Sequence, residues 1–336
     1  MSLLVVSQAD VVLLLPMNEC IAVMRDVFVA LARGDAVLPL RSMMALPDQR
    51  GVLALMPAYM TSTDTLAVKV ITVLPSNLDT PFDSHQGAVL LFDSEDGRLM
   101  ALLDASEITA IRTAATSALA TALLAREDAH DLAILGSGVE ARSHLNAMTT
   151  VRDVSRIRVW SRRSERAAAF AARESSQHGR NIAVCSNAEA AVRGADLICT
   201  TTAAPDPVLQ GSWISPGAHI NAVGAHTAAT RELDTEAVVN SSLFVDNRES
   251  AFHEAGDFLI PKGEGAVTDK HIVGDLGDLL LNESPGRKSD DEITLFKSLG
   301  VAVQDVAAAR HVYRRAIELG MGTQIEFGGL RNPPAS

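Results

Sequence analysis

Two glycines, Gly136 and Gly138, stand between an apolar run and a stretch of helical periodicity in the sequence AILGSGVEARSHL. The pattern Gly-x-Gly-x-x-Ala lets a strand turn tightly into a helix and lets the backbone approach a diphosphate closely. The unpaired N–H groups at the start of such a helix also attract an anion. We therefore expect a dinucleotide-binding turn that includes Ser137 and Val139, with an ordinary strand-to-helix turn as the alternative.

The residues after the next expected strand bear on which dinucleotide binds. About 20 residues past the glycines, an NAD site usually carries an acid that bonds the ribose 2′-hydroxyl. This sequence has Ser161, Arg162 and Arg163 there. A hydroxyl and two guanidinium groups suit a 2′-phosphate, so NADP(H) is favoured, with NAD(H) as the second choice. The alternative is two solvated arginines at the start of a helix.

Lys69 lies in the run TLAVKVITVL, in which both alternating faces of the expected strand are apolar. A lysine on such a strand is buried with its face, and a buried ammonium needs a partner or a lowered pKa. Both conditions are typical of active sites. The alternative is a lysine whose flexible stem reaches the rim of the sheet.

Other polar residues are candidates for substrate contacts. Arg112, in ITAIRTAAT, stands near the expected start of a helix, where a bound carboxylate would compensate its charge; a solvated first-turn arginine is the alternative. His226 follows the expected strand INAV at the carboxyl edge of a sheet, where ligands bind in doubly wound folds; a surface loop histidine is the alternative. His85 could donate to a substrate oxygen, and Arg41 is uninformative by itself.

The elements that must position these residues fall into two groups. Residues 17–31 have helical spacing, and residues 52–103 contain short β-rich runs with a tight hairpin at Asp96–Gly97, which predicts an α+β region with an antiparallel sheet. From Asp131, strand and helix patterns alternate, which predicts a parallel sheet covered on both faces. After about Gly300 a helical pattern follows, and it could return the chain to the first region, making that region discontinuous.

Composition excludes several classes of partner. The net charge of −12 and the pI near 5.2 oppose binding to nucleic acid or to anionic membranes. The apolar N-terminal stretch lacks the basic start of a signal peptide and the run of about 18 apolar residues that spans a bilayer. Three widely spaced cysteines in apolar surroundings indicate a reducing compartment. We expect a soluble, cytoplasmic protein without a metal site.

Taken together, the segments resemble the ornithine cyclodeaminase and mu-crystallin family over nearly the whole chain. The matching pieces are AVKVITVLPSN, HQGAVLLFD, TAIRTAATSALA, GSGVEARSHL, NAVGAH with RELD, VDNRESAFHEAGD and SDDEITLFKSLGVAVQDVAAA. The resemblance implies an α/β fold in which a Rossmann domain (116–300) is inserted in a substrate and dimerisation domain (1–115), to which the chain returns at 301–336. It also implies a homodimer.

The resemblance gives roles to single residues. By position, Arg41, Lys69 and Arg112 are similar to family residues that hold a substrate carboxylate, and Lys69 also lies beside the reacting carbon. Cyclodeaminases and archaeal alanine dehydrogenases carry an Asp where this sequence has His226. Mu-crystallin, a ketimine reductase, also lacks that Asp, so the sequence leans toward the reductase side of the family.

The sequence therefore predicts NAD(P)H-dependent reduction of a small cyclic imino acid, such as Δ1-pyrroline-2-carboxylate or Δ1-piperideine-2-carboxylate. Lys69 or His226 would supply the proton, and Arg41, Lys69, His85 and Arg112 would bind the substrate. Ornithine cyclisation or an amino-acid dehydrogenase activity is the enzymatic alternative, and a non-catalytic NADP(H)-binding crystallin is the alternative of another class. To the cofactor we assign, besides the residues of the glycine turn and Ser161–Arg163, also Thr113, Thr201, Val223, Gly224 and Ser298.

Overall fold

The chain passes from one compact unit to another inside helix α3 (Ala105–Leu124) and returns to the first unit after Gly300. The computed structural model describes residues 2–329. The first unit comprises residues 1–112 and 301–336, and the second comprises residues 113–300. Each unit has its own eight-stranded sheet. Short 3-10 turns occur at Pro47–Gln49, Thr61–Thr63, Pro75–Asp79, Gly211–Trp213 and Asp269–His271.

The sheet of the first unit is mainly antiparallel, as its alternating patterns predict. Its strands are β1 (Ser2–Val6), β2 (Ala36–Val37), β3 (Ser42–Ala45), β4 (Val52–Met60), β5 (Thr65–Val73), β6 (His85–Phe92), β7 (Leu99–Asp104) and β16 (Thr323–Glu326). They follow the order β16, β1, β7, β6, β5, β4, β2, with β3 paired to β4. β1 is parallel to β7, whereas the neighbours from β4 to β7 are antiparallel. The hairpin expected at Gly97 joins β6 to β7, which confirms that prediction.

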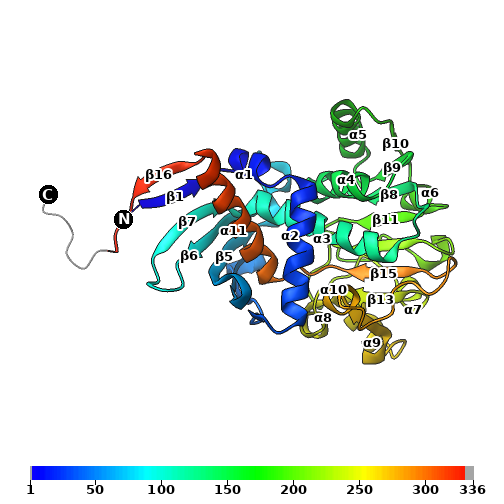
Figure 1. Ribbon diagram of the computed structural model, residues 1–336. Helices are drawn as coiled ribbons and strands as arrows, with labels where there is room; N and C mark the ends of the chain where they lie inside the picture. The colour runs from blue at the N-terminus through cyan, green and yellow to red at the C-terminus, as the bar shows by residue number, and fades with distance from the viewer. Residues whose placement is uncertain (1, 330–336) are drawn as a thin grey trace, which may run out of the picture. The chain divides into compact units, whose positions relative to one another are not determined.

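Three helices lie wholly within the first unit: α1 (Gln8–Leu14), α2 (Met17–Ala32) and α11 (Ala302–Leu319); the first part of α3 belongs to it as well. The apolar positions Met24 and Phe28 of α2 are fully buried, so the expected amphipathic helix is confirmed. Helix α11 packs against β4, β5, β6 and α2, and Figure 1 shows it between α2 and the sheet. The first turn of α11 thereby reaches the buried face of β5.

Strand β5 has one fully buried face and one partly open face. Ala67, Lys69 and Ile71 are buried, whereas Leu66 on the other face is exposed. Because side chains alternate along a strand, Lys69 is buried with its apolar neighbours and does not reach the rim. The prediction of a buried Lys69 is confirmed.

The second unit contains the expected parallel sheet with helices around it. Its strands are β8 (Asp131–Leu135), β9 (Arg156–Trp160), β10 (Ile182–Val184), β11 (Leu197–Thr200), β12 (His219–Ala222), β13 (Ser242–Val245), β14 (Ile272–Asp275) and β15 (Thr294–Lys297). They follow the order β10, β9, β8, β11, β12, β15, β13, β14, and every pair is parallel. This doubly wound arrangement confirms the predicted Rossmann architecture.

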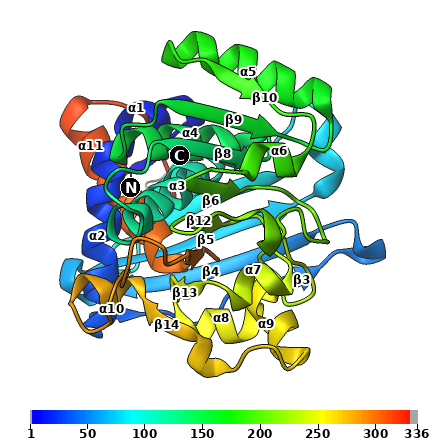
Figure 2. The same cartoon turned by 90° about the vertical axis from the view of Figure 1, so that its right-hand side faces the viewer.

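Helices cover this sheet. They are α4 (Val139–Val151), α5 (Ser164–His178), α6 (Ala188–Val192), α7 (Thr235–Val239), α8 (Arg248–Glu254), α9 (Gly256–Gly263) and α10 (Leu276–Leu280), besides part of α3. Figure 2 shows α5 with β10 at one edge of the sheet and α8 and α9 with β14 at the other. The central strands are buried along their length, as expected for a sheet covered on both faces.

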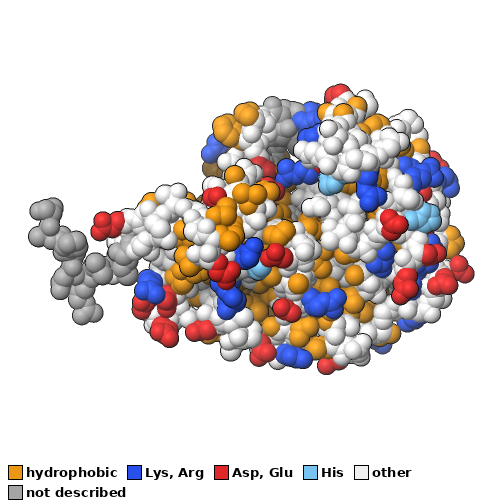
Figure 3. Space-filling model, turned by 45° about the horizontal axis from the view of Figure 1, so that its top comes forward, with side chains coloured by type: hydrophobic (Ala, Val, Ile, Leu, Met, Phe, Trp, Pro, Cys, Tyr) orange, Lys and Arg blue, Asp and Glu red, His pale blue; other side chains and the backbone are white. Residues whose placement is uncertain are grey.

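Charged side chains of both signs share the surface. On the face drawn in Figure 3, acidic side chains lie among basic ones. Cys20 and Cys199 are buried and Cys185 is partly buried, and all three are free thiols. Within residues 2–329, no helix is both long and apolar enough to span a bilayer.

Candidate active site

Lys69 forms a buried ion pair in the first unit. Its Nζ lies 2.9 Å from Asp305 Oδ2, and it donates a hydrogen bond of 3.3 Å to Thr109 Oγ1. The Lys69 side chain is only 2% exposed. Burial lowers the pKa of Lys69 from 10.5 to about 8, against the opposing attraction of Asp305; Arg112 and Arg41 lower it further. Lys69 can therefore gain or lose a proton near neutral pH.

Arg112 forms a second ion pair with the same carboxylate. Its Nε donates to Asp305 Oδ1 at 2.9 Å, and its Nη1 donates to Gln304 Oε1 at 2.8 Å. The expected position of Arg112 near the start of a helix is wrong, because α3 begins at Ala105 and Arg112 is a buried residue well inside it. Its charge is therefore compensated by the side chains of α11, and the argument from the helix dipole does not apply.

Arg41 and His85 add to the positive charge around Lys69. Arg41 lies between β2 and β3 and is half-buried, and it acts electrostatically on Lys69. His85 opens β6, and its Nδ1 lies 3.0 Å from Ser84 Oγ. Burial lowers the pKa of His85, and Lys69 and Arg112 lower it further against the attraction of Asp83. The four residues predicted to contact substrate thus interact within the first unit.

Sequence reasoning missed Asp305, the anion that joins these cations. It lies in the first turn of α11 and is 1% exposed. Although burial opposes ionisation, Arg112 and Lys69 hold the pKa of Asp305 below its usual value. The detectable signal was a polar pair, Gln304 and Asp305, within the apolar helical pattern VAVQDVAAA.

The glycine turn of the second unit is crowded at its first glycine and open at its second. Gly136 has a φ of +134°, and a Cβ there would lie 2.4 Å from Thr201 Oγ1. Gly138 is the N-cap residue of α4, which starts at Val139, and a Cβ on Gly138 would have no atom within 4 Å. The first glycine is therefore required by the fold, whereas the second leaves open space beside a helix N-terminus.

The residues expected to choose between the dinucleotides adjoin this turn. Ser137 Oγ donates to Ser161 Oγ at 3.1 Å, which connects the turn after β8 with the loop after β9. Arg163 is the N-cap residue of α5 and is half-buried, whereas Arg162 is exposed. Both arginines therefore precede a helix N-terminus beside the glycine turn.

A buried glutamate holds the loops at the carboxyl ends of β11 and β12. Glu232 accepts hydrogen bonds from Thr200 Oγ1 (2.8 Å), from the Thr202 backbone N–H and Oγ1 (2.7 Å each) and from the Gly224 N–H (2.6 Å). Gly224 leaves no room for a side chain, since its Cβ would lie 1.9 Å from the Thr202 carbonyl oxygen. Glu232 was not predicted, although it lies in the RELD motif. It fixes the loops that carry the predicted residues Thr201 and Val223.

Three further predicted residues lie in the second unit. Ser298 follows β15 and is 2% exposed, and its Oγ has no hydrogen-bond partner among the described residues. Thr113 is buried within α3. His226 is half-buried two residues after Gly224, with Nδ1 3.2 Å from the Gly224 carbonyl oxygen. A buried hydroxyl without a protein partner is suited to a bound ligand.

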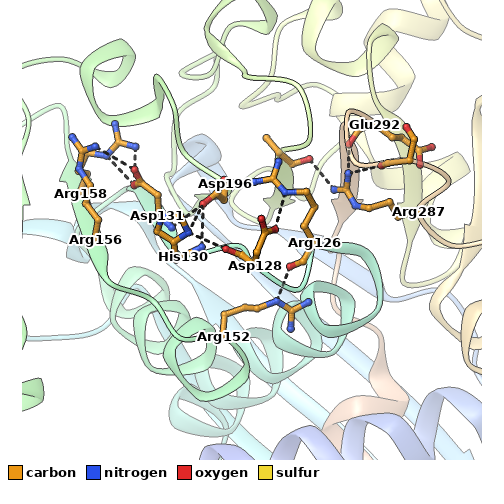
Figure 4. Close-up of polar contacts among 12 residues, drawn as sticks. Arg126, Asp128, His130, Asp131, Arg152, Arg156, Arg158, Asp196, Arg287 and Glu292 are labelled. Carbon is orange, nitrogen blue, oxygen red and sulfur yellow. Dashed lines mark hydrogen bonds and ion pairs between the residues drawn. The ribbon is translucent and has the colours of Figure 1, made fainter.

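At the amino ends of the strands in the second unit, charged side chains form ion pairs with one another (Figure 4). Arg126 contacts Asp196 at 2.6 Å and Asp128 at 3.1 Å. Asp131, the first residue of β8, accepts from Arg158 at 2.8 Å. These pairs connect strands and loops at the end of the sheet opposite the glycine turn. Their role is therefore structural.

A family model matches most of the chain. Residues 1–320 match the family model described as the ornithine cyclodeaminase/mu-crystallin family. The chain belongs to this family. The resemblance seen in the sequence is thereby confirmed.

Known proteins resemble this chain over most of its length. Ketimine reductase mu-crystallin of Mus musculus is 42% identical over 280 residues, which are 83% of this chain and 85% of the mouse protein. The structure of Thermococcus litoralis Δ1-pyrroline-2-carboxylate reductase with NADH and L-proline is 37% identical, has a TM-score of 0.93 and covers 95% of this chain and 99% of its own. An archaeal alanine dehydrogenase dimer with bound NAD is 30% identical, has a TM-score of 0.91 and covers 98% of this chain and 100% of its own.

Proposed function

We propose that this protein is an NAD(P)H-dependent reductase of small cyclic imino acids of the Δ1-pyrroline-2-carboxylate or Δ1-piperideine-2-carboxylate type. The observation that carries the proposal is the buried cluster of Lys69 and Arg112 on one carboxylate, Asp305. The names of the mouse and Thermococcus relatives confirm the predicted enzyme class, a reductase that acts on a carbon–nitrogen double bond. We further propose that the first unit binds the substrate and the second binds the cofactor.

The positive side chains of the first unit support the proposal that it binds the carboxylate of the substrate. Protonated Lys69 and Arg112 carry two positive charges, and Asp305 neutralises one of them. We propose that a substrate carboxylate forms charge-assisted hydrogen bonds with both cations, and that Arg41, which acts electrostatically on Lys69, adds attraction. We propose that this fixed charge orients the imino acid with its C=N carbon next to the Lys69 side chain.

Lys69 is suited to hold the proton that the reduction consumes. Reduction of a cyclic imine adds a hydride to carbon and a proton to nitrogen. With a pKa of about 8, Lys69 is largely protonated at pH 7 but gives up its proton more readily than an exposed lysine does. We propose Lys69 as the donor and His226 as the alternative donor or relay.

The second unit fits a nicotinamide dinucleotide. The crowded Gly136, the open space at Gly138 and the Ser298 hydroxyl, which has no hydrogen-bond partner within residues 2–329, support this assignment. When bound, the reduced nicotinamide supplies the hydride. We propose that Gly136–Val139 hold the diphosphate, and that Thr113, Thr201, Val223, Gly224 and Ser298 surround the nicotinamide end. We further propose that Ser161, Arg162 and Arg163 favour the 2′-phosphate of NADP(H).

We also propose a homodimer that covers exposed apolar side chains of strands β2, β3 and β4 in the first unit. They are Val37 in β2, Met43 and Met44 in β3, and Leu55 in β4. Edge strands with apolar side chains are typical of surfaces that pair with another chain. The similarity to a dimeric alanine dehydrogenase supports this assembly. Sedimentation of the wild type and of a Met43→Asp/Met44→Asp variant tests it, with a dimer and a monomer as the expected results.

The deciding experiment measures oxidation of NADPH and of NADH by the purified protein with each of the two cyclic imino acids. We expect turnover with both cofactors and a higher kcat/KM for NADPH. Release of ammonia from ornithine with NAD, without imine reduction, would favour a cyclodeaminase instead. Binding of NADPH without turnover of any imino acid would favour a non-catalytic binding protein.

A further inference from the structure

We propose that Asp305 is the positioning residue of the substrate site, holding the Lys69 ammonium and the Arg112 guanidinium at the separation at which both can meet one substrate carboxylate. This inference rests on the proposed function. Asp305 is 1% exposed and forms ion pairs with both cations, so its part in the chemistry is to fix their positions.

The geometry assigns one oxygen of the carboxylate to each cation. Oδ2 of Asp305 lies 2.9 Å from Lys69 Nζ, and Oδ1 accepts from Arg112 Nε at 2.9 Å. The two cations come from different elements, β5 and α3, so their spacing in the sequence does not set the distance between them in space. The width of a single carboxyl group therefore sets how far apart the two positive groups lie.

Helix α11 fixes Asp305 in turn. Asp305 is in the first turn of α11, where the helix dipole favours a negative charge. Its neighbour Gln304 accepts from the Val301 backbone N–H at 3.2 Å and from Arg112 Nη1 at 2.8 Å, so the guanidinium has two anchors on this turn. Since α11 packs along β4, β5 and β6, the anchors cannot move without moving the helix.

Asp305 is also the negative group among the charges that act on Lys69. From the elements around it, Lys69 meets Asp305 and Thr109, and it interacts electrostatically with Arg112, Arg41 and His85. The Cys20 thiol of α2, which interacts with Arg112, stays neutral because burial raises its pKa to about 12. Without the Asp305 charge, the positive groups would repel one another in a buried site, and Lys69 would lose its proton at lower pH.

The test measures the affinity for pyrrole-2-carboxylate, a planar ring carboxylate, by calorimetry across a pH series. Affinity in the wild type should weaken as Lys69 deprotonates, with a midpoint near its pKa of about 8. In Asp305→Asn, we expect the midpoint to fall by about one pH unit or more, because the counter-charge is lost. An unchanged midpoint in folded Asp305→Asn would overturn the proposal. This readout needs no turnover, so it separates failure of this proposal from failure of the proposed reductase activity.

Two more variants distinguish a positioning role of Asp305 from a general loss of folded structure. Asp131→Asn breaks another buried aspartate–arginine pair, with Arg158 at 2.8 Å, in the second unit, and should leave the midpoint unchanged. Asp305→Glu keeps the charge but moves it by one methylene. It should restore the midpoint while leaving kcat for imine reduction at least tenfold below the wild-type value. Wild-type kcat in Asp305→Glu would contradict a positioning role, and this arm stays informative if Asp305→Asn does not fold.

Discussion

Ser137 and Ser161 are joined by a hydrogen bond of 3.1 Å between their hydroxyls, although 24 positions separate them in the sequence. The bond places the glycine turn after β8 beside the loop after β9, where Arg162 and Arg163 precede α5. In a doubly wound fold the diphosphate lies on the first of these loops and the ribose at the second. The proposed preference for NADP(H) therefore depends on the residues of these two loops.

Replacing both arginines should selectively weaken use of NADPH. For Arg162→Ala/Arg163→Ala we expect kcat/KM with NADPH to fall about tenfold to a hundredfold, since a hydrogen bond to a charged group contributes roughly 1.5–3 kcal/mol. The value with NADH should change little. Arg173→Ala, further along α5 and paired with Glu174 at 2.7 Å, is the control for charge alone. Equal losses with both cofactors would refute a role in recognition of the 2′-phosphate.

Single alanines at the two glycines should have different effects. Gly136→Ala adds a Cβ 2.4 Å from Thr201 Oγ1 at a φ of +134°, so we expect a lower Tm and a loss of dinucleotide binding. Gly138→Ala meets no atom within 4 Å, so the Tm should stay near the wild-type value while dinucleotide affinity falls. Thermal unfolding and NADPH titration measure the two effects. Full affinity in Gly138→Ala would argue against a diphosphate at this turn.

Lys69 should make the stability of the ligand-free protein depend on pH. Its pKa falls from 10.5 to about 8 on folding, mainly because it is buried. The unfolded chain therefore binds more protons between these values, and the free energy of unfolding rises with pH across that window. In Lys69→Met this part of the rise should vanish. Denaturant unfolding of both proteins at intervals from pH 8 to 10.5 measures it. Parallel curves would show that Lys69 is not held in the way the structure indicates.

Glu232 should matter for both stability and cofactor binding. Its carboxylate accepts hydrogen bonds from two backbone N–H groups, those of Thr202 and Gly224, and an amide nitrogen in its place would face a donor. We expect Glu232→Gln to lower the free energy of unfolding by about 1–3 kcal/mol and to weaken dinucleotide binding. Glu236→Gln, on the exposed side of α7, is the matched control and should change neither. Unaltered binding in Glu232→Gln would mean that these loops do not contact the cofactor.

The sequence was most informative where a local pattern decides the structure. Gly136, Gly138 and the alternation around Lys69 depend on the residues beside them, so the parallel sheet and the buried lysine could be predicted. The pairing of Asp305 with Lys69 and Arg112, and that of Glu232 with Thr200, could not be predicted, because these partners lie far away in the chain. The misplacement of Arg112 near a helix start had a related cause, since α3 begins directly after β7 without a loop to mark it.

His226 provides the last prediction, because it stands where some relatives were expected to carry an aspartate. It is half-buried, and its Nδ1 lies 3.2 Å from the Gly224 carbonyl oxygen, so the ring is oriented by the loop that Glu232 holds. If His226 donates or relays the proton, His226→Ala should lower kcat for imine reduction at least tenfold with little change in NADPH affinity. His253→Ala, an exposed histidine of α8, is the control. Unchanged turnover in His226→Ala would leave Lys69 as the donor, and the pH at which kcat falls should then follow the pKa of Lys69.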